Sequence, residues 1–355
     1  MPVIHQLLAG YRPGDAIGAE ADAIAALCEA HGLAARLWSP HATTAPEGLG
    51  RCGNVRALPA AVRPDDVALL HLSIGSPANE VFRSLPCRRV VLYHNVTPPR
   101  FFERTAPATA AVLEEGLRQV RSLAGAAHAS WAVSRFNADE LERMGWSGVR
   151  VFPLLVPEGF ARGPVDPGVQ ARLSDPPADN LLFVGRLAPN KRHDRLLRIF
   201  RAYQRANPAS RLVLAGRTAG AEPYLAMLLG MSSVLALRGV WFTDYLRADE
   251  LAACYATASA FVCASDHEGF CAPLLEAMSW RIPVFAAACA AVPETLDGAG
   301  VLFAPDTPPE AVAETIARVL RDPALREAVL KRQDERLARF HARDAWKELK
   351  EVLFG

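Results

Sequence analysis

Residues 259–294 read SAFVCASDHEGFCAPLLEAMSWRIPVFAAACAAVPE and predict a strand, a loop, a helix and a second strand in succession. Ala260–Ala264 is a short apolar run of residues that favour β-structure, which is typical of a buried strand. A helix is expected over residues 272–280, because Pro273 is tolerated only in the first turn of a helix. An extended run, Val284–Ala288, then completes the kind of unit that builds α/β proteins.

The loop inside this unit offers backbone hydrogen-bond donors. Gly269, Phe270 and Cys271 stand between the strand and the helix, and their N–H groups are expected to face the space beyond the strand end. A helix N-terminus carries about half a positive charge, which favours anions. The loop therefore predicts a seat for a phosphate group.

Two carboxylates bracket this seat. Glu268 lies in the loop and Glu276 lies one turn into the helix, so the two can face one cleft at different depths. A carboxylate accepts hydrogen bonds from neighbouring hydroxyls, which makes a ribose and a hexose suitable ligands. The alternative is that both carboxylates only complement the helix dipole.

The complete pattern resembles a known family. E-G-F-x-x-P-x-x-E-A-M begins at Glu268 and is followed by Pro283 and Pro293, as in the retaining glycosyltransferases of family 4, which have the GT-B fold. Their E-x7-E signature matches Glu268 and Glu276. The family usually has glycine where this chain has Cys271, and cysteine can serve there if its backbone φ is negative.

A second motif follows the first expected strand of the second half. The family pattern G-R-L-x-x-x-K matches Gly185, Arg186 and Lys191. By resemblance, the two cations offset the charge of a nucleotide diphosphate, since arginine offers a fork and lysine a movable point charge. Each cation alone is also compatible with a solvated surface position. The chain has no D-x-D motif that would hold a divalent metal beside a diphosphate, so no metal and no cofactor are expected.

The first half begins with a similar unit. Val3–Leu8 is predicted as a strand and Ala19–His31 as a helix, with a glycine-bearing loop between them. G-x-G-x-x-G is absent, so nothing supports nicotinamide binding. In the family, a glycine-rich loop at this place approaches the donor diphosphate, and Gly14 and Gly18 match it loosely. A plain strand-to-helix turn is the alternative for each glycine.

A histidine ends another expected strand, Arg89–His94. In open α/β sheets, ligands bind beyond the carboxyl ends of strands, which is where His94 lies. A lone histidine can equally be structural. Family 4 enzymes often place a histidine here, reaching the transferred sugar, and the run YHNVTPPRFF resembles a subgroup that acts in bacterial polysaccharide assembly.

The order of the elements predicts two domains. Residues 157–177 are rich in proline, glycine and aspartate and are typical of a linker. Strands alternate with helices on both sides of it, with one strand of the second series expected at Val234–Leu237. We therefore expect an α/β protein of GT-B type: two facing doubly wound Rossmann-like domains, residues 1–157 and 178–339, with a cleft between them. The resemblance implies that the helix over residues 340–355 crosses back to the first domain, and the alternative is that it stays on the second.

Composition narrows the class of protein. The 355 residues are 51% hydrophobic and 22% charged, which is ordinary for a globular protein, and a net charge of +1 argues against nucleic acid as a partner. Seven scattered cysteines without a C-x-x-C motif are typical of a reducing compartment. No signal peptide and no run of the ~20 apolar residues that span a bilayer is recognised. We expect a cytoplasmic protein that at most rests on the inner face of a membrane.

The resemblance to family 4 implies a retaining hexosyltransferase. It also implies a nucleotide-diphosphate sugar, GDP-mannose or a UDP-sugar, as the donor and a glycan or a lipid-linked saccharide as the acceptor. By resemblance, Glu276 holds the ribose, Arg186 and Lys191 the diphosphate, and Glu268 and His94 the sugar. The departing phosphate takes the acceptor's proton, so no separate protein base is required. The alternatives are a non-catalytic GT-B subunit that binds a sugar nucleotide or glycan, and a sugar-nucleotide epimerase, for which further catalytic carboxylates and histidines are not identified.

Overall fold

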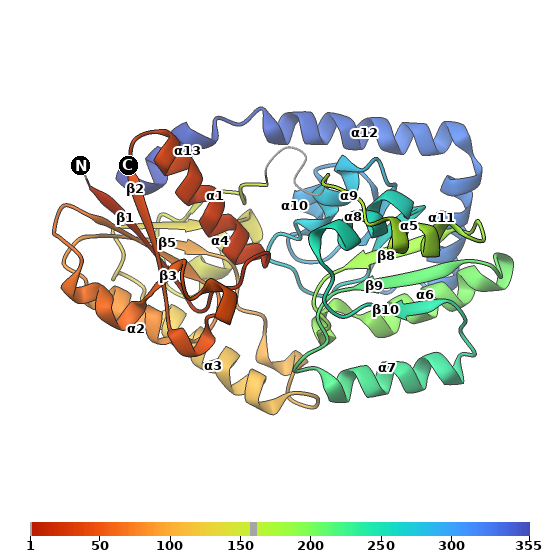
Figure 1. Ribbon diagram of the computed structural model, residues 1–355, viewed down its shortest axis with the longest axis horizontal. Coiled ribbons are helices and arrows are strands. Elements are labelled where there is room, and N and C mark those ends of the chain that lie inside the picture. The colour runs from red at the N-terminus through yellow and green to blue at the C-terminus, as the bar shows by residue number, and fades with distance from the viewer. Residues whose placement is uncertain (1, 157–161) are drawn as a thin grey trace. The chain divides into compact units, whose positions relative to one another are not determined.

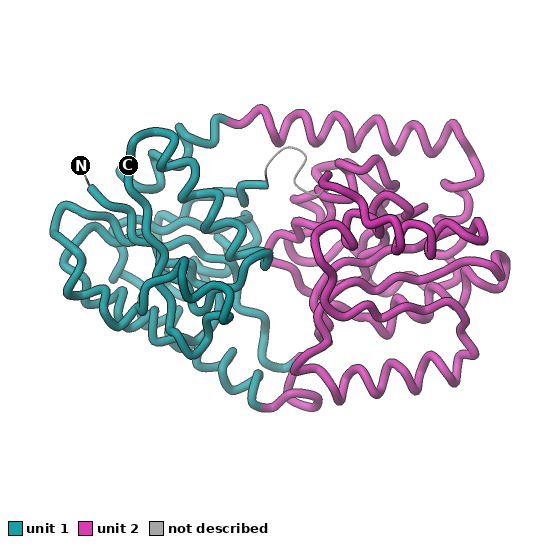
Figure 2. Tube along the Cα trace, in the orientation of Figure 1, with its two compact units in different colours: residues 1–100, 108–156, 344–355 teal, residues 101–107, 157–343 magenta. Residues whose placement is uncertain are grey.

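The computed structural model describes residues 2–156 and 162–355, which form two compact units (Figure 1). Among the described residues, unit 1 contains residues 2–100, 108–156 and 344–355, and unit 2 contains residues 101–107 and 162–343 (Figure 2). The predicted linker, residues 157–177, falls partly outside the described residues. Its later part contains a helix, α5 (Pro167–Ser174), which begins where the Asp166 side chain accepts from the Val169 N–H.

Unit 1 is built on a seven-stranded sheet in the order β3-β2-β1-β4-β5-β6-β7, with every neighbouring pair parallel. Its strands are β1 (Val3–Leu8), β2 (Ala34–Ser39), β3 (Cys52–Asn54), β4 (Val67–Leu72), β5 (Arg88–Tyr93), β6 (Ala129–Ala132) and β7 (Arg150–Val151). Its α-helices are α1 (Ala16–Ala30), α2 (Pro77–Ser84), α3 (Pro107–Ser122), α4 (Arg135–Arg143) and α13 (Ala345–Phe354).

Unit 2 is built on a six-stranded parallel sheet in the order β10-β9-β8-β11-β12-β13. The strands are β8 (Asn180–Val184), β9 (Arg211–Ala215), β10 (Val240–Phe242), β11 (Ala260–Cys263), β12 (Val284–Ala287) and β13 (Val301–Phe303). Besides α5, the α-helices are α6 (His193–Ala206), α7 (Glu222–Val234), α8 (Ala248–Thr257), α9 (Pro273–Ser279), α10 (Val292–Leu296), α11 (Pro309–Arg321) and α12 (Pro323–His341).

Both sheets are doubly wound, as predicted. Their central strands are apolar and buried because helices cover both faces of a parallel sheet; every residue of β4 and of β11 is buried. In each sheet the strand order reverses beside the first strand, between β1 and β4 and between β8 and β11. Loops that leave the carboxyl ends of strands at such a reversal form the usual ligand site of open α/β sheets.

The C-terminal helix α13 belongs to unit 1. The Arg88 side chain donates from Nε to the carbonyl oxygen of Leu353 at 2.7 Å, and the rings of His31 and Trp346 stack with centroids 4.0 Å apart. The second contact places α13 beside the end of α1, as Figure 1 shows. Buried apolar side chains of α13, together with these polar contacts, hold the chain end on this sheet.

Two predicted elements differ from the structure: one strand does not form, and one helix begins earlier than expected. The strand expected at Val234–Leu237 is the end of α7 and a turn, in which Val234 is 86% exposed and Ala236 adopts a left-handed φ of 49°. An apolar run forms a strand only where neighbouring elements bury it. In this part of the chain the strand that forms is β10, which begins at Val240. The helix expected from Ala19 begins at Ala16, because Asp15 caps it.

Among the described residues, no helix combines the length and the apolar character that crossing a bilayer requires.

Candidate functional site

Two loops of unit 2 leave the strands at which the sheet order reverses. The loop after β8 carries Gly185, Arg186 and Lys191, and the loop after β11 carries Glu268. Because β8 and β11 are parallel neighbours, their carboxyl ends lie at the same edge of the sheet. The fold therefore brings together two motifs that are 77 residues apart from Lys191 to Glu268.

Polar contacts hold these two loops to each other. Asn190 donates from Nδ2 to the His267 carbonyl oxygen at 3.1 Å, and the Asp266 N–H donates to the Asn190 carbonyl oxygen at 2.8 Å. Arg192, in a left-handed conformation with φ 53°, donates from Nη1 to Asp266 at 2.7 Å. Sequence reasoning missed these residues, since no motif marks single polar residues whose partners are distant along the chain.

Lys191 and Glu268 form an ion pair at this edge. The Lys191 Nζ lies 2.6 Å from Glu268 Oε2, and the side chains are 23% and 7% exposed. Burial alone would lower the pKa of Lys191, but the Glu268 carboxylate more than offsets this and the pKa is raised. The pair thus places two charged groups at one strand end. The ammonium group can bind an anion, and the carboxylate can accept hydrogen bonds from hydroxyls.

Arg186 and Gly185 complete the first motif. Arg186 is exposed. The Gly185 N–H donates to the Ala215 carbonyl oxygen at 2.8 Å, so that group is used to join β8 to β9. A Cβ on Gly216 would come within 2.1 Å of the Gly185 carbonyl oxygen, which shows how closely the two strand ends approach. Gly185 therefore shapes the loop that presents Arg186.

Glu276 lies in the first turn of α9, a seven-residue helix whose N-terminus has no side-chain cap. Tyr255 of α8 donates from its hydroxyl to Glu276 Oε2 at 2.5 Å, and its ring is stacked on Trp280. Burial raises the pKa of Glu276, while the Tyr255 hydrogen bond acts in the opposite direction. Tyr255 is a further site residue that no sequence motif indicated.

The loop residues before α9 have different surroundings. The Phe270 ring is buried and lies 6.2 Å from the ring of Phe340 in α12, and the Thr295 hydroxyl donates to the Phe270 carbonyl oxygen. The Phe270 side chain thus anchors the loop, and Gly269 precedes it. Cys271 has φ +71°, so the negative φ required for cysteine to replace glycine without strain is not met. This corrects the expectation: Cys271 occupies a backbone conformation that favours glycine.

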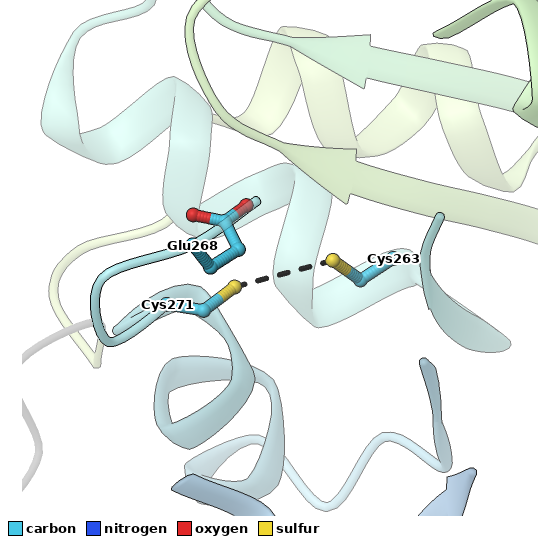
Figure 3. A group of neighbouring side chains, drawn as sticks. All are labelled: Cys263, Glu268 and Cys271. Atoms are coloured by element: carbon cyan, nitrogen blue, oxygen red, sulfur yellow. Dashed lines mark hydrogen bonds between the residues drawn. The ribbon is translucent and has the colours of Figure 1, made fainter. Parts of the chain in front are cut away.

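Two thiols meet beside Glu268. The Sγ of Cys263, at the end of β11, lies 4.0 Å from the Sγ of Cys271. Figure 3 shows the two sulfur atoms pointing toward each other, with Glu268 on the same loop as Cys271. One ligand atom from each of the three residues lies within 4.8 Å of the others.

His94 of unit 1 directly follows β5. Its N–H donates to the Leu72 carbonyl oxygen at 2.9 Å, and Asn95, with φ 85°, then turns the chain away from the sheet. The Asn95 amide donates to Glu140 Oε2 at 2.8 Å, which fixes that turn. His94 is half-buried at the strand end, where it was predicted.

A series of hydrogen-bonded side chains leads from His94 into the interior of the sheet. Gln6 of β1 donates from Nε2 to the Ala21 carbonyl oxygen at 2.9 Å, so its Oε1 accepts from His71 Nε2 at 2.8 Å. Burial lowers the pKa of His71 to about 3, so its ring is neutral and Nδ1 accepts from His94 Nε2 at 2.9 Å. Burial and His71 also lower the pKa of His94. His94 is therefore neutral at pH 7, with an acceptor at Nδ1.

Gly18 is not in the loop after β1, where it was expected. It lies inside α1, and its N–H donates to the Asp15 carboxylate at 2.5 Å as part of the helix cap. A Cβ on Gly18 would lie 2.5 Å from the Arg12 carbonyl oxygen. The predicted position of Gly18 is therefore wrong, and close packing accounts for the glycine.

Part of the chain is similar to known proteins. Residues 178–322 match the family model described as glycosyl transferases group 1. O-antigen chain mannosyltransferase B of Escherichia coli is 31% identical over 152 residues, which cover 41% of this chain and 38% of that protein. The GDP-mannose-dependent alpha-(1-6)-phosphatidylinositol monomannoside mannosyltransferase of Mycolicibacterium smegmatis is 32% identical over 44% of each chain. The matched region spans less than half the length of these relatives.

Solved structures resemble the chain over its full length. Sucrose-phosphate synthase from Thermosynechococcus elongatus has a TM-score of 0.74 at 19% identity, covering 99% of this chain and 98% of that one. HepE from Anabaena, in complex with UDP and glucose, has a TM-score of 0.71 at 17% identity, covering 99% of both chains. Structural similarity at sequence identities this low shows the fold alone. It confirms the predicted α/β class with two Rossmann-like units. Residues 178–322, which hold the paired Lys191 and Glu268, are the part of the chain that matches the glycosyl transferases group 1 model.

Proposed function

We propose that this chain is a retaining glycosyltransferase. It transfers a hexosyl group from a nucleotide-diphosphate sugar to a glycan or a lipid-linked saccharide. The observation that carries the proposal is the Lys191–Glu268 pair, 2.6 Å apart at the carboxyl ends of β8 and β11, within a glycosyl transferases group 1 domain. A sugar nucleotide has the two features that this pair complements, a diphosphate for the cation and sugar hydroxyls for the carboxylate.

The diphosphate is assigned to Lys191 and Arg186. Negative charge grows on the leaving diphosphate as the bond to the sugar breaks, and fixed cations at that place lower the barrier. Arg186 is exposed, so a ligand can reach its guanidinium. Lys191 already has a raised pKa and stays charged across the physiological range. No divalent metal is assigned to this step.

The sugar and ribose are assigned to the acidic and imidazole groups. Glu276, held by Tyr255, accepts from the ribose hydroxyls, and Glu268 accepts from the transferred sugar. His94 uses its Nδ1 acceptor for a sugar hydroxyl. In a front-face reaction the leaving phosphate oxygen takes the acceptor's proton as the new glycosidic bond forms, and configuration at the anomeric carbon is kept.

The donor is GDP-mannose or a UDP-sugar. One relative is named as GDP-mannose-dependent, and one structure of the same fold was solved with UDP and glucose. The acceptor class follows from relatives named for O-antigen and phosphatidylinositol mannoside. A lipid-linked acceptor would bring the protein to the inner face of a membrane, with the reaction on the cytoplasmic side.

A non-catalytic subunit that binds a sugar nucleotide is the competing function. Both functions predict binding of a nucleotide diphosphate, and only the enzyme predicts turnover. The deciding experiment incubates the purified full chain with labelled GDP-mannose and UDP-glucose, with and without lipid-linked saccharides. Label appearing in the saccharide supports the enzyme. Tight donor binding with no transfer to any acceptor supports the subunit.

A further inference from the structure

We propose that Cys263, Cys271 and Glu268 form a binding site for a thiophilic divalent cation such as Zn²⁺. The three residues lie on β11 and on the loop that follows it, with ligand atoms within 4.8 Å of one another (Figure 3). Two sulfur ligands and one carboxylate oxygen are a donor set that zinc accepts. The proposed function assigns no role to the two thiols.

The distance between the sulfur atoms distinguishes a metal site from a disulfide. Two thiolates on one tetrahedral zinc, each about 2.3 Å from the metal, lie about 3.8 Å apart. The sulfur atoms of a disulfide lie about 2.0 Å apart. The two thiols are hydrogen-bonded across 4.0 Å, which excludes a disulfide and brings the sulfur atoms close to the separation that a shared zinc requires. The Glu268 oxygen, within 4.8 Å of both sulfur atoms, would have to approach by no more than about 1 Å to complete three corners of the tetrahedron.

Charge balance favours an occupied site. Binding would release one proton from each thiol, giving two thiolates and the Glu268 carboxylate around a dication. Lys191, 2.6 Å from Glu268 Oε2, supplies one more positive charge, so the cluster as a whole is neutral. A buried cluster without net charge avoids the large cost of isolated buried ions. Lys191 occupies one carboxylate oxygen, and the other is the metal ligand.

The backbone at Cys271 supports a role for its side chain. A residue with φ +71° carries strain that glycine would avoid, and such strain is found where a particular side chain is placed for function. Here it places the Cys271 sulfur opposite Cys263. Cys263 is buried and Cys271 is partly exposed, so the site lies near the surface of the loop. A fourth position is left for water or an anionic oxygen.

The consequence for activity is inhibition. A bound cation ties up the Glu268 carboxylate and the adjacent Lys191, which the proposed function assigns to the sugar and the diphosphate. This consequence rests on the proposed function, whereas cation binding does not. Binding is therefore measured first, without any sugar nucleotide.

The binding experiment uses Co²⁺ as a spectroscopic substitute for Zn²⁺. The full chain, kept reduced with a phosphine, is titrated with Co²⁺, and thiolate-to-cobalt charge-transfer absorption is recorded in the near ultraviolet. We expect saturation at one equivalent and loss of the band when Zn²⁺ is added. Cys263→Ser and Cys271→Gly should each remove at least half of the band. Zinc affinity should fall at least about tenfold in each variant, since even outer contacts of metal sites have effects of this size.

The variants include a matched control. Cys271→Gly removes the thiol and relieves the left-handed strain, so its loss of binding does not reflect misfolding. Cys289→Ser alters a neighbouring thiol, which donates to the Asp266 carbonyl oxygen at 2.6 Å, and should keep the full band. Three results would overturn the site: no charge-transfer band in the reduced wild-type chain, a band that survives Cys263→Ser and Cys271→Gly, or a band abolished by Cys289→Ser.

A second measurement connects the site to turnover. Once a transfer assay is in hand, Zn²⁺ should inhibit the wild-type chain at concentrations at least about tenfold lower than it inhibits Cys271→Gly. Equal inhibition of the two, with the cobalt band intact, would contradict the inhibitory role. If no transfer is found with any donor, the proposed function fails while the cobalt result still decides the cation site.

Discussion

His94 donates a hydrogen bond from Nε2 to Nδ1 of the buried His71, across 2.9 Å. Gln6 fixes the direction of this bond by accepting from the other side of the His71 ring. The imidazole of His94 therefore offers a lone pair at Nδ1, which can accept from a sugar hydroxyl. The same bond connects His94 to a buried residue of the sheet, although a position at a strand end does not require such a connection.

Replacing His94 with alanine should cut turnover about 100-fold, the usual effect of removing one group that stabilises the transition state. Affinity for the nucleotide diphosphate should change little, because its assigned partners are on unit 2. The variant should also lose about 1–3 kcal/mol of unfolding free energy, because the buried Nδ1 of His71 loses its donor. Turnover at saturating donor and the melting temperature measure the two effects.

His5 provides a matched control for that variant. It is a buried histidine of the same sheet, which accepts from Trp38 Nε1 at 3.0 Å and contacts Asp66. His5→Ala should lower the melting temperature without a comparable fall in turnover, measured well below the transition. If His94→Ala behaves like His5→Ala, His94 is a structural histidine.

Alanine substitutions of Arg186 and Lys191 should differ in their effect on stability. Arg186→Ala should weaken binding of a nucleotide diphosphate by about 1.5–3 kcal/mol, the value of a charged hydrogen bond, and leave stability unchanged because Arg186 is exposed. Lys191→Ala should weaken binding similarly. It should also lower the free energy of unfolding by up to about 5 kcal/mol, because Glu268 is left buried without its partner.

Calorimetric titration with GDP, UDP and the bare nucleosides checks this prediction. The double variant Lys191→Met, Glu268→Gln is the control, since it removes both charges and should recover the lost stability. Equal losses for the diphosphate and the nucleoside would exclude a phosphate contact for the residue concerned.

Glu276→Gln should raise stability while it weakens donor binding. Burial raises the pKa of Glu276 above its ordinary value of 4.5, so the folded chain disfavours the ionised form. The stability that this group contributes is complete below about pH 4.5 and is lost as the pH rises through the folded pKa. Glutamine removes this loss, so the variant should melt higher than the wild type at pH 7 and equally at pH 4.

Melting curves from pH 4 to 8 test the stability part of this prediction. A variant that melts lower at pH 7 would mean that the Glu276 charge is favoured in the folded state. For the ligand part, wild-type affinity for ribo- and 2′-deoxyribonucleotide donors is compared. Equal affinities would exclude a contact of Glu276 with the 2′-hydroxyl.

Transfer should not require a divalent metal. Excess EDTA is expected to leave turnover at least as high as before, because cations of the protein assist the leaving diphosphate and because a trace of bound zinc would be removed. Turnover abolished by EDTA and restored by Mg²⁺ or Mn²⁺ would contradict the metal-free clamp.

Local patterns in the sequence predicted much of the fold. The strand Val3–Leu8 has the predicted bounds, and the helix expected over residues 272–280 is α9 with its two capping residues. Apolar runs and a proline at a helix start are local signals, so they need no knowledge of the rest of the chain. The run at Val234–Leu237 has the same signal and forms no strand, because no neighbouring strand buries it.

Partners across the sheet could not be predicted in this way. Nothing near Lys191 indicates that its partner is Glu268, and nothing near His94 indicates His71. These pairs form because β8 lies beside β11 and β4 beside β5, which is decided by the topology of the whole unit. The φ of Cys271 is a further case, since a cysteine in place of glycine gives no sign of which conformation the loop imposes.

The central claim is that this chain transfers a hexosyl group with retention of configuration. Proton NMR of one reaction mixture tests it most directly, by following the anomeric signals of GDP-mannose or UDP-glucose with a lipid-linked saccharide and the full chain. We predict that the donor signal is replaced by a product signal of the same anomeric configuration, at a rate that falls in Arg186→Ala. A product of inverted configuration, or an unchanged donor with every acceptor offered, would contradict it.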